Sequence, residues 1–388
     1  MYSFNDYIQR GMVFIRNQAF PSKKKLSSLM IYATDLCDSA CKHCLIWAKR
    51  PVTYLPKEKI FDLVSNNKCV SSSTTVGLEG GEFLLHPNAL EILEWFKTNH
   101  PKFDLLSNCL KPLKLIEAVK KYPPHRLWIS LDGDKESYLH MRGKDGYDSV
   151  LKVIQELKDF VPISVMFTLS PYNDFADMKH VAEVCKRNNI DMRVGIYNNI
   201  PFFDTLETAH ITEIGMKKDG EILTFKLAEE KKLIAKEIQC IPGINSSEDI
   251  LDQIPEEIKE FKENYDFLVL YNSWKNNKTQ LRCFSIFDSV IVLPNGDVPI
   301  CQNLDLKLGN IYHHSLDDIL NSVETIEQQK WHNKNCNRCW INYHRKYDVV
   351  LYKTFENYFG SWATRKLFGY YQWDDNSKTT YKDLFSQK

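Results

Sequence analysis

Short apolar runs alternate with longer amphipathic stretches from about residue 28 onward, and this alternation limits the folds open to the chain. The runs are rich in branched and aromatic residues and have the length of strands. They span residues 28–33, 75–79, 103–107, 126–131, 162–168 and 192–197. Alternating strands and helices form βα units with a parallel sheet. The runs therefore predict an α/β fold, an open or partial (β/α)6 barrel with its chemistry at the carboxyl ends of the strands.

Helix signals fall between these runs. Pro56, Pro87 and Pro112 stand near predicted first turns, where a missing backbone N–H costs nothing. In residues 148–160 four apolar positions fall on one helical stripe, of the kind that packs against a sheet. These positions are Val150, Val153, Ile154 and Leu157.

The pattern changes beyond residue 200. Residues 201–282 are rich in charge, contain predicted helices at 226–238 and 255–265, and are interpreted as a connector or insertion that could contact substrate. Residues 287–301 hold two apolar runs around Asn295-Gly296, which predicts a β-hairpin.

Two further signals follow the predicted hairpin. Ser315 and Asp318 have capping-box spacing, so a helix is expected to start there. The tail from residue 341 is dense in aromatic residues. We expect it to form helices packed against the barrel rather than a membrane-surface anchor, because apolar helical stripes usually belong to a core.

Charge and the N-terminal sequence restrict the partners and the compartment. The 50 basic and 50 acidic side chains cancel, which gives no electrostatic case for a nucleic-acid or membrane surface. Residues 1–20 interrupt their apolar positions with Asp6, Arg10 and Arg16 and so lack the run that a signal peptide or membrane span requires. We expect a cytoplasmic protein with no nucleic-acid partner and no membrane span. Its 11 cysteines are then better explained as metal ligands, nucleophiles or buried small hydrophobes than as disulfides.

Cys37, Cys41 and Cys44 form a C-x3-C-x2-C loop directly after the first predicted strand. A structural zinc site would want four ligands, commonly as two separated pairs. A reactive thiol would need one cysteine. A 4Fe-4S cubane is held by thiolates at such close spacings, and three protein ligands leave one iron free to bind another molecule. The spacing favours the cluster but leaves another metal open.

This loop resembles the signature of radical S-adenosylmethionine (radical SAM) enzymes. In that family the free iron is chelated by the amino and carboxylate groups of S-adenosylmethionine. One electron from the reduced cluster then cleaves the cofactor to a 5′-deoxyadenosyl radical, which abstracts a substrate hydrogen. The resemblance implies a 4Fe-4S cluster on the three cysteines, bound S-adenosylmethionine, and a reductant such as flavodoxin or ferredoxin.

Other segments of residues 28–200 resemble the same family in the same order. Gly80, Gly81 and Glu82 resemble its Gly-Gly-Glu segment, whose backbone and carboxylate bind the cofactor amino group; paired glycines let a main chain approach a ligand closely. Phe83 stands where the family usually has proline.

The remaining candidates for cofactor binding lie at later strand ends. The family places polar groups near the cofactor at these strand ends, and the positions that match them here are Ser107, Asn108, Ser130 and Asp132. Arg142 matches the arginine that pairs with the cofactor carboxylate, a task suited to a planar guanidinium. His43 is interpreted as a spacer whose backbone approaches the adenine, not as a metal ligand. Taken singly, these residues could equally be helix caps, turns or a solvated charge.

Cys283, Cys301, Cys336 and Cys339 form a second group. Four thiolates satisfy a cubane or a structural zinc, and spacing alone favours zinc. After a radical SAM core, however, the group resembles a SPASM or twitch extension, which holds auxiliary 4Fe-4S clusters. The full SPASM pattern has further cysteines, and none follows Cys339. We therefore expect one auxiliary cluster with four protein ligands, used for electron transfer or structural support.

These observations predict five segments. They are an N-terminal extension (1–27), a radical SAM partial barrel (28–200), a connector or insertion (201–282), a small auxiliary-cluster domain with a hairpin and a helix (283–340), and an aromatic-rich helical tail (341–388). Cys69, Cys109, Cys185 and Cys240 are most simply buried small hydrophobes. Cys240, before a proline and a glycine, could instead be an exposed thiol that donates a hydrogen atom, as in radical SAM epimerases.

The expected function is hydrogen abstraction from an unactivated carbon, followed by dehydrogenation, epimerisation or bond formation. Fewer than thirty residues precede the first predicted strand, too few for an N-terminal peptide-recognition domain. We therefore expect a small metabolite or sugar as substrate. A maturase of a ribosomally made peptide is the first alternative, and a zinc-stabilised, non-catalytic binding protein is the second.

Overall fold

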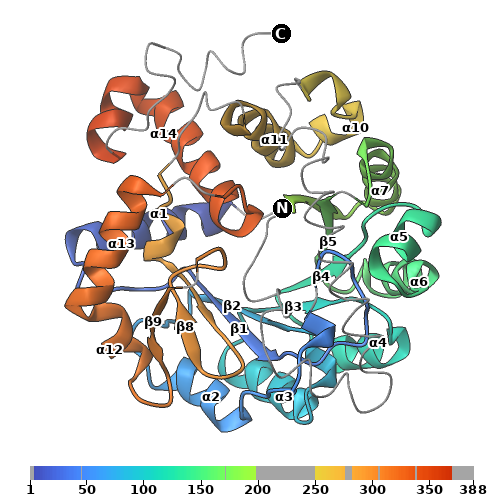
Figure 1. Cartoon of the computed structure of the whole chain (residues 1–388), viewed down its shortest axis with the longest axis horizontal. Helices are drawn as coiled ribbons and strands as arrows, with labels where there is room; N and C mark the ends of the chain where they lie inside the picture. The colour runs from blue at the N-terminus through green and yellow to red at the C-terminus, as the bar shows by residue number, and fades with distance from the viewer. Residues whose placement is uncertain are drawn as a thin grey trace, which may run out of the picture.

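A seven-stranded parallel sheet forms a half-barrel, with helices around its outer side (Figure 1). The computed structural model describes residues 4–44, 46–170, 172–197, 250–275, 282–304, 306–336 and 339–368. The strand order is β6-β5-β4-β3-β2-β1-β7. The first six strands are β1 (Ser28–Thr34), β2 (Thr75–Gly80), β3 (Phe103–Ser107), β4 (Arg126–Ser130), β5 (Ile163–Leu169) and β6 (Asp191–Ile196). All six predicted strands are confirmed, each to within one residue at either end.

The two faces of the sheet differ in chemistry because successive side chains point to opposite sides. On the outer face the apolar side chains of β1 and β2 are fully buried against the helices. They include Leu29, Ile31, Val76 and Leu78. On the inner face β2 presents Gly77 and Glu79, and register places Gly77 opposite Asp104 of β3. Polar groups therefore face the inside of the half-barrel.

The helices between the strands are amphipathic, as their sequences predict. They are α2 (Lys57–Ser65), α3 (Ala89–Asn99), α4 (Pro112–Lys121), α5 (Lys135–Arg142), α6 (Tyr147–Leu157) and α7 (Phe175–Asn188). The four stripe positions predicted in residues 148–160 are all fully buried on α6. Pro112 is the first residue of α4, where it removes no hydrogen bond.

A seventh strand, β7 (Ser289–Val292), pairs in parallel with β1, with Ser28 opposite Ser289. The turn of the predicted hairpin forms: the Gly296 N–H donates to the Leu293 carbonyl and the Leu293 N–H donates to the Asp297 carbonyl, both at 2.9 Å, and Gly296 has a φ of 84°. Beyond these two bonds the predicted pairing is wrong, because the run before the turn joins β1 and not the run after it. All four residues of β7 are buried, and adding this apolar run to the sheet covers the open edge of β1. The hairpin pairs β8 (Asp297–Pro299) with β9 (Lys307–Asn310) instead.

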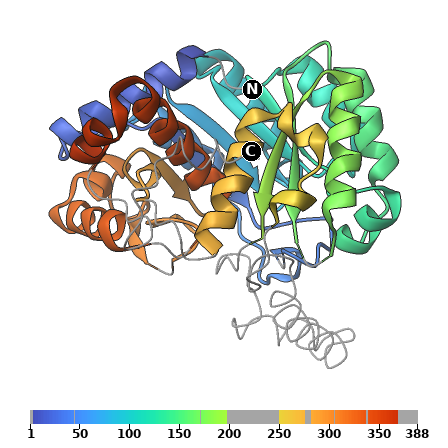
Figure 2. The same ribbon diagram turned by 90° about the horizontal axis from the view of Figure 1, so that it is seen from above.

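The C-terminal region lies at the β7 edge of the sheet, beside α1 (Phe4–Ala19), α12 (Leu316–Asn321), α13 (Val323–Asn335) and α14 (Asn342–Phe368) (Figure 2). Two further helices, α10 (Glu256–Lys259) and α11 (Lys262–Lys275), lie toward the other edge, where α10 contacts α7 and α11 contacts β6. Ser315 caps α12 as predicted, since its Oγ accepts the Asp318 N–H at 3.1 Å. The predicted helix at 226–238 and Cys240 lie outside the described residues.

The described part of the aromatic tail, residues 341–368, packs over only some of its length, and the predicted tail beyond residue 368 lies outside the described residues. Tyr347 and Val349 of α14 are buried, and α14 contacts α11 and β6. Beyond them, Tyr358 and Trp362 are 79% and 74% exposed. In the part of the chain that the structure describes, no helix is long and apolar enough to cross a membrane.

Candidate active site

A cavity of about 420 Å³ runs along the inside of the half-barrel, from the loop after β1 to side chains of α1 and α14. Eleven of the predicted residues line it: Cys37, Cys41, His43, Cys44, Gly80, Gly81, Glu82, Ser107, Asn108, Ser130 and Arg142. Asp132 does not line it. The structure thus brings together the three-cysteine loop and the polar strand ends that the sequence placed far apart.

The Gly-Gly-Glu segment holds the start of the cysteine loop. The Gly81 N–H donates to the Thr34 carbonyl at 2.7 Å, and the Glu82 N–H donates to the Leu36 carbonyl at 2.8 Å. A Cβ on Gly81 would meet the Leu36 oxygen at 2.2 Å. The sequence interpretation assigned the close approach of these glycines to a ligand; the structure shows that the cysteine loop already requires it.

The end of α5 holds the middle of the same loop. The N–H groups of Ala40 and Lys42 donate to the carbonyls of Arg142 and Met141 at 3.1 and 2.9 Å. These carbonyls belong to the last turn of the helix, where they lack partners within the helix. Gly143 ends α5 with a φ of 65°, and a Cβ there would lie 2.7 Å from the Ala40 oxygen. Cys41 is therefore fixed between β1 and α5.

Polar groups surround the sulfurs of the loop. The Ser39 hydroxyl lies 3.0 Å from Cys41 Sγ, Arg142 Nη1 donates to Cys41 Sγ at 3.7 Å, and Asn108 Nδ2 donates to Cys37 Sγ at 3.8 Å. Burial raises the pKa of Cys37, and it raises the pKa of Cys44 to about 12. These two cysteines are therefore protonated unless a cation stabilises their thiolates, and binding of a metal centre would release those protons.

The donor set fits an iron–sulfur cluster. Three thiols border one cavity beside N–H and O–H donors, the surroundings in which such clusters are held and tuned. Among the described residues, no three His, Cys, Asp or Glu side chains are grouped so that they could hold a single metal ion. In a cubane, by contrast, each thiolate binds a different iron, so the sulfurs do not have to converge on one point.

Glu82 is a fixed carboxylate beside this loop. Ser107 Oγ donates to its Oε1 at 2.9 Å, and the Asn108 N–H donates to its Oε2 at 2.8 Å. Burial raises the pKa of Glu82 to about 7. An ammonium group in the cavity would favour the ionised form and form a charge-assisted hydrogen bond with it.

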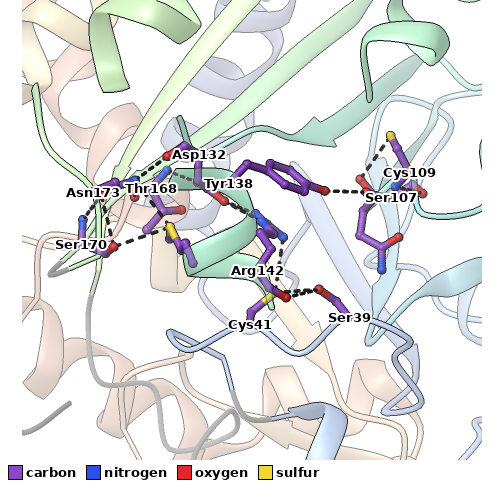
Figure 3. Close-up of polar contacts among 12 residues, drawn as sticks. Ser39, Cys41, Ser107, Cys109, Asp132, Tyr138, Arg142, Thr168, Ser170 and Asn173 are labelled. Atoms are coloured by element: carbon purple, nitrogen blue, oxygen red, sulfur yellow. Dashed lines mark hydrogen bonds and ion pairs between the residues drawn. The ribbon is translucent and has the colours of Figure 1, made fainter. Parts of the chain in front are cut away.

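Arg142 and Asp132 form a buried pair (Figure 3). Arg142 Nε donates to Asp132 Oδ2 at 2.6 Å, and Asp132 Oδ1 accepts the Thr168 N–H at 2.8 Å. Arg142 Nη1 points the other way, toward Cys41 (Figure 3). Asp132 is thus placed behind the arginine, where it orients the guanidinium.

His43 and Glu79 complete the description of this cavity. Nδ1 of His43 is buried without a hydrogen-bond partner, and burial lowers the pKa of His43 to about 4, so the ring is neutral. Glu79 was not predicted. Burial and the nearby charge of Asp104 raise the pKa of Glu79 to about 8. Its place directly before Gly80, on an inward-facing strand position, was the signal that could have found it.

The second cysteine group is also brought together. A small separate cavity is lined by Cys283, Cys301, Cys336 and Cys339. Cys283 precedes η5 (Ser285–Phe287), Cys301 follows β8, and Cys336 and Cys339 follow α13. Asn333 Nδ2 donates to the Cys283 carbonyl at 2.8 Å and so holds one of these segments. Arg345 lines the same cavity and was not predicted.

A parallel half-barrel with a three-cysteine loop after its first strand, followed by a second cysteine group, defines a radical SAM enzyme with an auxiliary iron–sulfur domain. Residues 31–185 match the radical SAM superfamily, and residues 283–340 match the SPASM iron–sulfur cluster-binding domain. The chain belongs to the radical SAM superfamily and carries a SPASM domain, which confirms the resemblance inferred from the sequence. These two domains imply 4Fe-4S clusters and S-adenosylmethionine as cofactors.

Two relatives illustrate the match. The antilisterial bacteriocin subtilosin biosynthesis protein AlbA of Bacillus subtilis (strain 168) is 25% identical over 303 residues, which cover 74% of this chain and 58% of AlbA. The crystal structure of Streptococcus suis SuiB bound to S-adenosylmethionine matches with a TM-score of 0.54 at 16% identity, covering 87% of this chain and 76% of SuiB. SuiB bound to the precursor peptide SuiA matches with a TM-score of 0.53 at 13% identity, covering 90% of this chain and 76% of SuiB. This structural likeness shows the fold.

Proposed function

We propose that this enzyme is a maturase that abstracts a hydrogen atom from a ribosomally made peptide. The relatives support a peptide: AlbA is named for the biosynthesis of a bacteriocin, and SuiB has been solved with a precursor peptide. This choice reverses the order of preference drawn from the sequence, where a small metabolite or sugar came first. The shortness of the segment before β1 does not count against a peptide that a separate protein delivers.

The cofactor seat in this proposal is the carboxyl end of the sheet. Cys37, Cys41 and Cys44 would hold a 4Fe-4S cluster beside bound S-adenosylmethionine. With an electron from a flavodoxin or ferredoxin, these cofactors would supply the radical chemistry of hydrogen abstraction. The role of the chain is to aim the radical and exclude water and oxygen.

Named side chains orient the cofactor. Glu82, held by Ser107 and Asn108, accepts hydrogen bonds from the cofactor amino group. Arg142 offers its Nη1, which Asp132 does not use, to the cofactor carboxylate. The remaining cofactor contacts in this proposal come from His43, Gly80, Gly81 and Ser130, all of which line the cavity.

The observation that carries the proposal is the continuity of one cavity from the cysteine loop into the half-barrel. At about 420 Å³ it lies at the small end of ligand sites, which range from roughly 300 to 1,000 Å³. It must hold both the cofactor and the reacting group. We infer that only a residue or two of the peptide enters and that the remainder stays outside.

The second cysteine group holds one auxiliary 4Fe-4S cluster in this proposal. Its four protein ligands, Cys283, Cys301, Cys336 and Cys339, leave no open iron, so it does not ligate substrate. When a product forms with the net loss of two hydrogens, one electron and one proton must leave the substrate after the hydrogen atom has gone. The auxiliary cluster is suited to accept that electron.

The test uses anaerobically reconstituted protein, dithionite and S-adenosylmethionine. We expect about eight irons per chain and formation of 5′-deoxyadenosine. We expect the protein to contain no zinc and to keep its activity when a zinc chelator is added.

The substrate class is tested next. Candidate peptides encoded beside the gene, and sugar nucleotides as the competing class, are added to the enzyme, and their masses are followed by mass spectrometry. A peptide that loses two hydrogens indicates dehydrogenation or bond formation; an unchanged mass with an inverted centre indicates epimerisation. Turnover of a sugar nucleotide and not of a peptide would overturn the substrate class. A Cys37→Ala variant is the inactive control.

A further inference from the structure

Two opposite charges lie beside the second cysteine group, one turn apart on α14. Arg345 is 1% exposed and lines the cavity of the four cysteines. Asp348 is fully buried, and its Oδ2 lies 3.8 Å from Arg345 Nη1. A buried ion pair is weak evidence for stability, because apolar residues of similar volume are often as good or better. The pair therefore calls for a reason other than folding.

Both residues are tied to the backbone next to cluster ligands. Arg345 Nε donates to the Cys339 carbonyl at 3.1 Å. Asp348 Oδ1 accepts the Phe284 N–H, directly after Cys283, at 3.1 Å. These contacts fix the two charges relative to the sulfurs, with the guanidinium on the cavity and the carboxylate outside its lining.

We propose that Arg345 and Asp348 set the reduction potential of the auxiliary cluster in opposite directions. The inference rests on the auxiliary cluster of the proposed function. Reduction adds one negative charge to the cluster, and in a buried site charge interactions are weakly screened. Arg345 stabilises the reduced state and raises the potential, whereas Asp348 lowers it. Net charge and hydrogen bonds near the sulfurs are known controls of such potentials.

The test isolates the auxiliary cluster in the full-length chain. Cys37, Cys41 and Cys44 are all replaced by alanine, the protein is reconstituted anaerobically, and the midpoint potential is measured by titration followed by electron paramagnetic resonance. The titration is done at pH 9, because burial raises the pKa of Asp348 to about 7 and the test needs the ionised carboxylate. Adding Arg345→Gln should lower the potential by about 60 mV, a tenfold change in the one-electron equilibrium. Adding Asp348→Asn should raise it. Arg345→Lys, which keeps the charge, should stay closer to the parent than Arg345→Gln does.

Lys353→Gln is the matched control, because Lys353 is a cation of the same helix that pairs with Asp266. It should leave the potential unchanged. The inference is supported if the midpoint potential falls in Arg345→Gln and rises in Asp348→Asn. Water that entered through a loosened site would instead change the potential of both variants in the same direction. Equal shifts, or none, overturn it. Should Arg345→Gln lose its iron, Asp348→Asn decides alone, and a fall or no change overturns the inference.

The two proposals fail differently. If the triple-alanine parent takes up no iron, the auxiliary cluster itself is refuted. If the parent carries about four irons and its midpoint potential changes with neither Arg345→Gln nor Asp348→Asn, only the inference about Arg345 and Asp348 is refuted.

Discussion

The guanidinium of Arg142 donates to the carboxylate of Asp132 at 2.6 Å, and the structure buries both side chains. Asp132 does not line the cavity, and it acts there through its partners Arg142 and Thr168, which do. The arrangement gives the first of four predictions.

Asp132→Asn should destabilise the protein and weaken cofactor binding. Removing one partner of a buried pair leaves an uncompensated charge and costs about 3 kcal/mol or more. We expect this loss in urea unfolding of the apo protein, and weaker binding of S-adenosylmethionine by calorimetry on reconstituted protein. Glu136→Gln, at an exposed position of α5, the helix that carries Arg142, is the control and should change neither. Unchanged cofactor affinity would show that Asp132 does not orient Arg142.

Gly81→Ala should remove the first cluster and spare the second. The new Cβ would overlap the Leu36 carbonyl, so the loop that carries Cys37 must move. We expect iron to fall from about eight to about four per chain, with loss of 5′-deoxyadenosine formation. Gly11→Ala, where no atom lies within 4 Å, is the control and should keep all its iron. A variant with full iron would mean that the loop does not depend on this close contact.

Cys301→Ser should produce the complementary loss. Removing one ligand of the second group should halve the iron content, while cleavage of S-adenosylmethionine without substrate continues at the first site. Cys185→Ser changes a fully buried cysteine of α7 and should keep all its iron. Iron and zinc are both measured; zinc in place of iron at the second site would favour the structural-metal interpretation of that group.

Glu79→Gln should alter the dependence of stability on pH. The folded protein favours the neutral carboxyl, with a pKa of about 8 against 4.5 for the free group. Between these values the folded protein holds a proton that the unfolded chain has released, so stability falls as pH rises from 4.5 to 8.

The variant should remove this fall and be more stable than wild type at pH 8, by about 2 kcal/mol after allowance for water in the cavity. Urea unfolding of the apo protein at pH 5 and pH 8 measures it. Glu117→Gln, on the exposed side of α4, is the control. An equal slope in wild type and Glu79→Gln would contradict the prediction.

The sequence predicted what depends on local pattern. The strands and the α6 stripe followed from hydrophobic period, and the cysteine loop followed from spacing at the end of the first strand. The pairing of β7 could not be predicted in this way, because Asn295-Gly296 specifies a turn but not the strand that a flanking run joins. The strand that residues 289–292 join depends on which edge of the sheet is left unpaired, and that is set by the order of all the strands.

Burial of charge was the other limit. Arg345, Asp348 and Glu79 look in the sequence like solvated side chains, and only packing makes them buried or cavity-facing. Asp132 was predicted at the correct strand end, but its partner within the chain, Arg142, lies ten positions away on another element. Sequence position alone could not separate a cofactor contact from a residue that orients one.

The pairing of β7 with β1 has a consequence for the spacing of the two cysteine groups. β1 leads into the first cysteine loop, and β7 belongs to the segment that supplies the second group. A ladder of main-chain hydrogen bonds thus joins the supports of both sites, and no hinge separates these two strands. The distance between the two cysteine groups is therefore built into the sheet, and excising the second domain would uncover the edge of β1 as well as remove four cysteines.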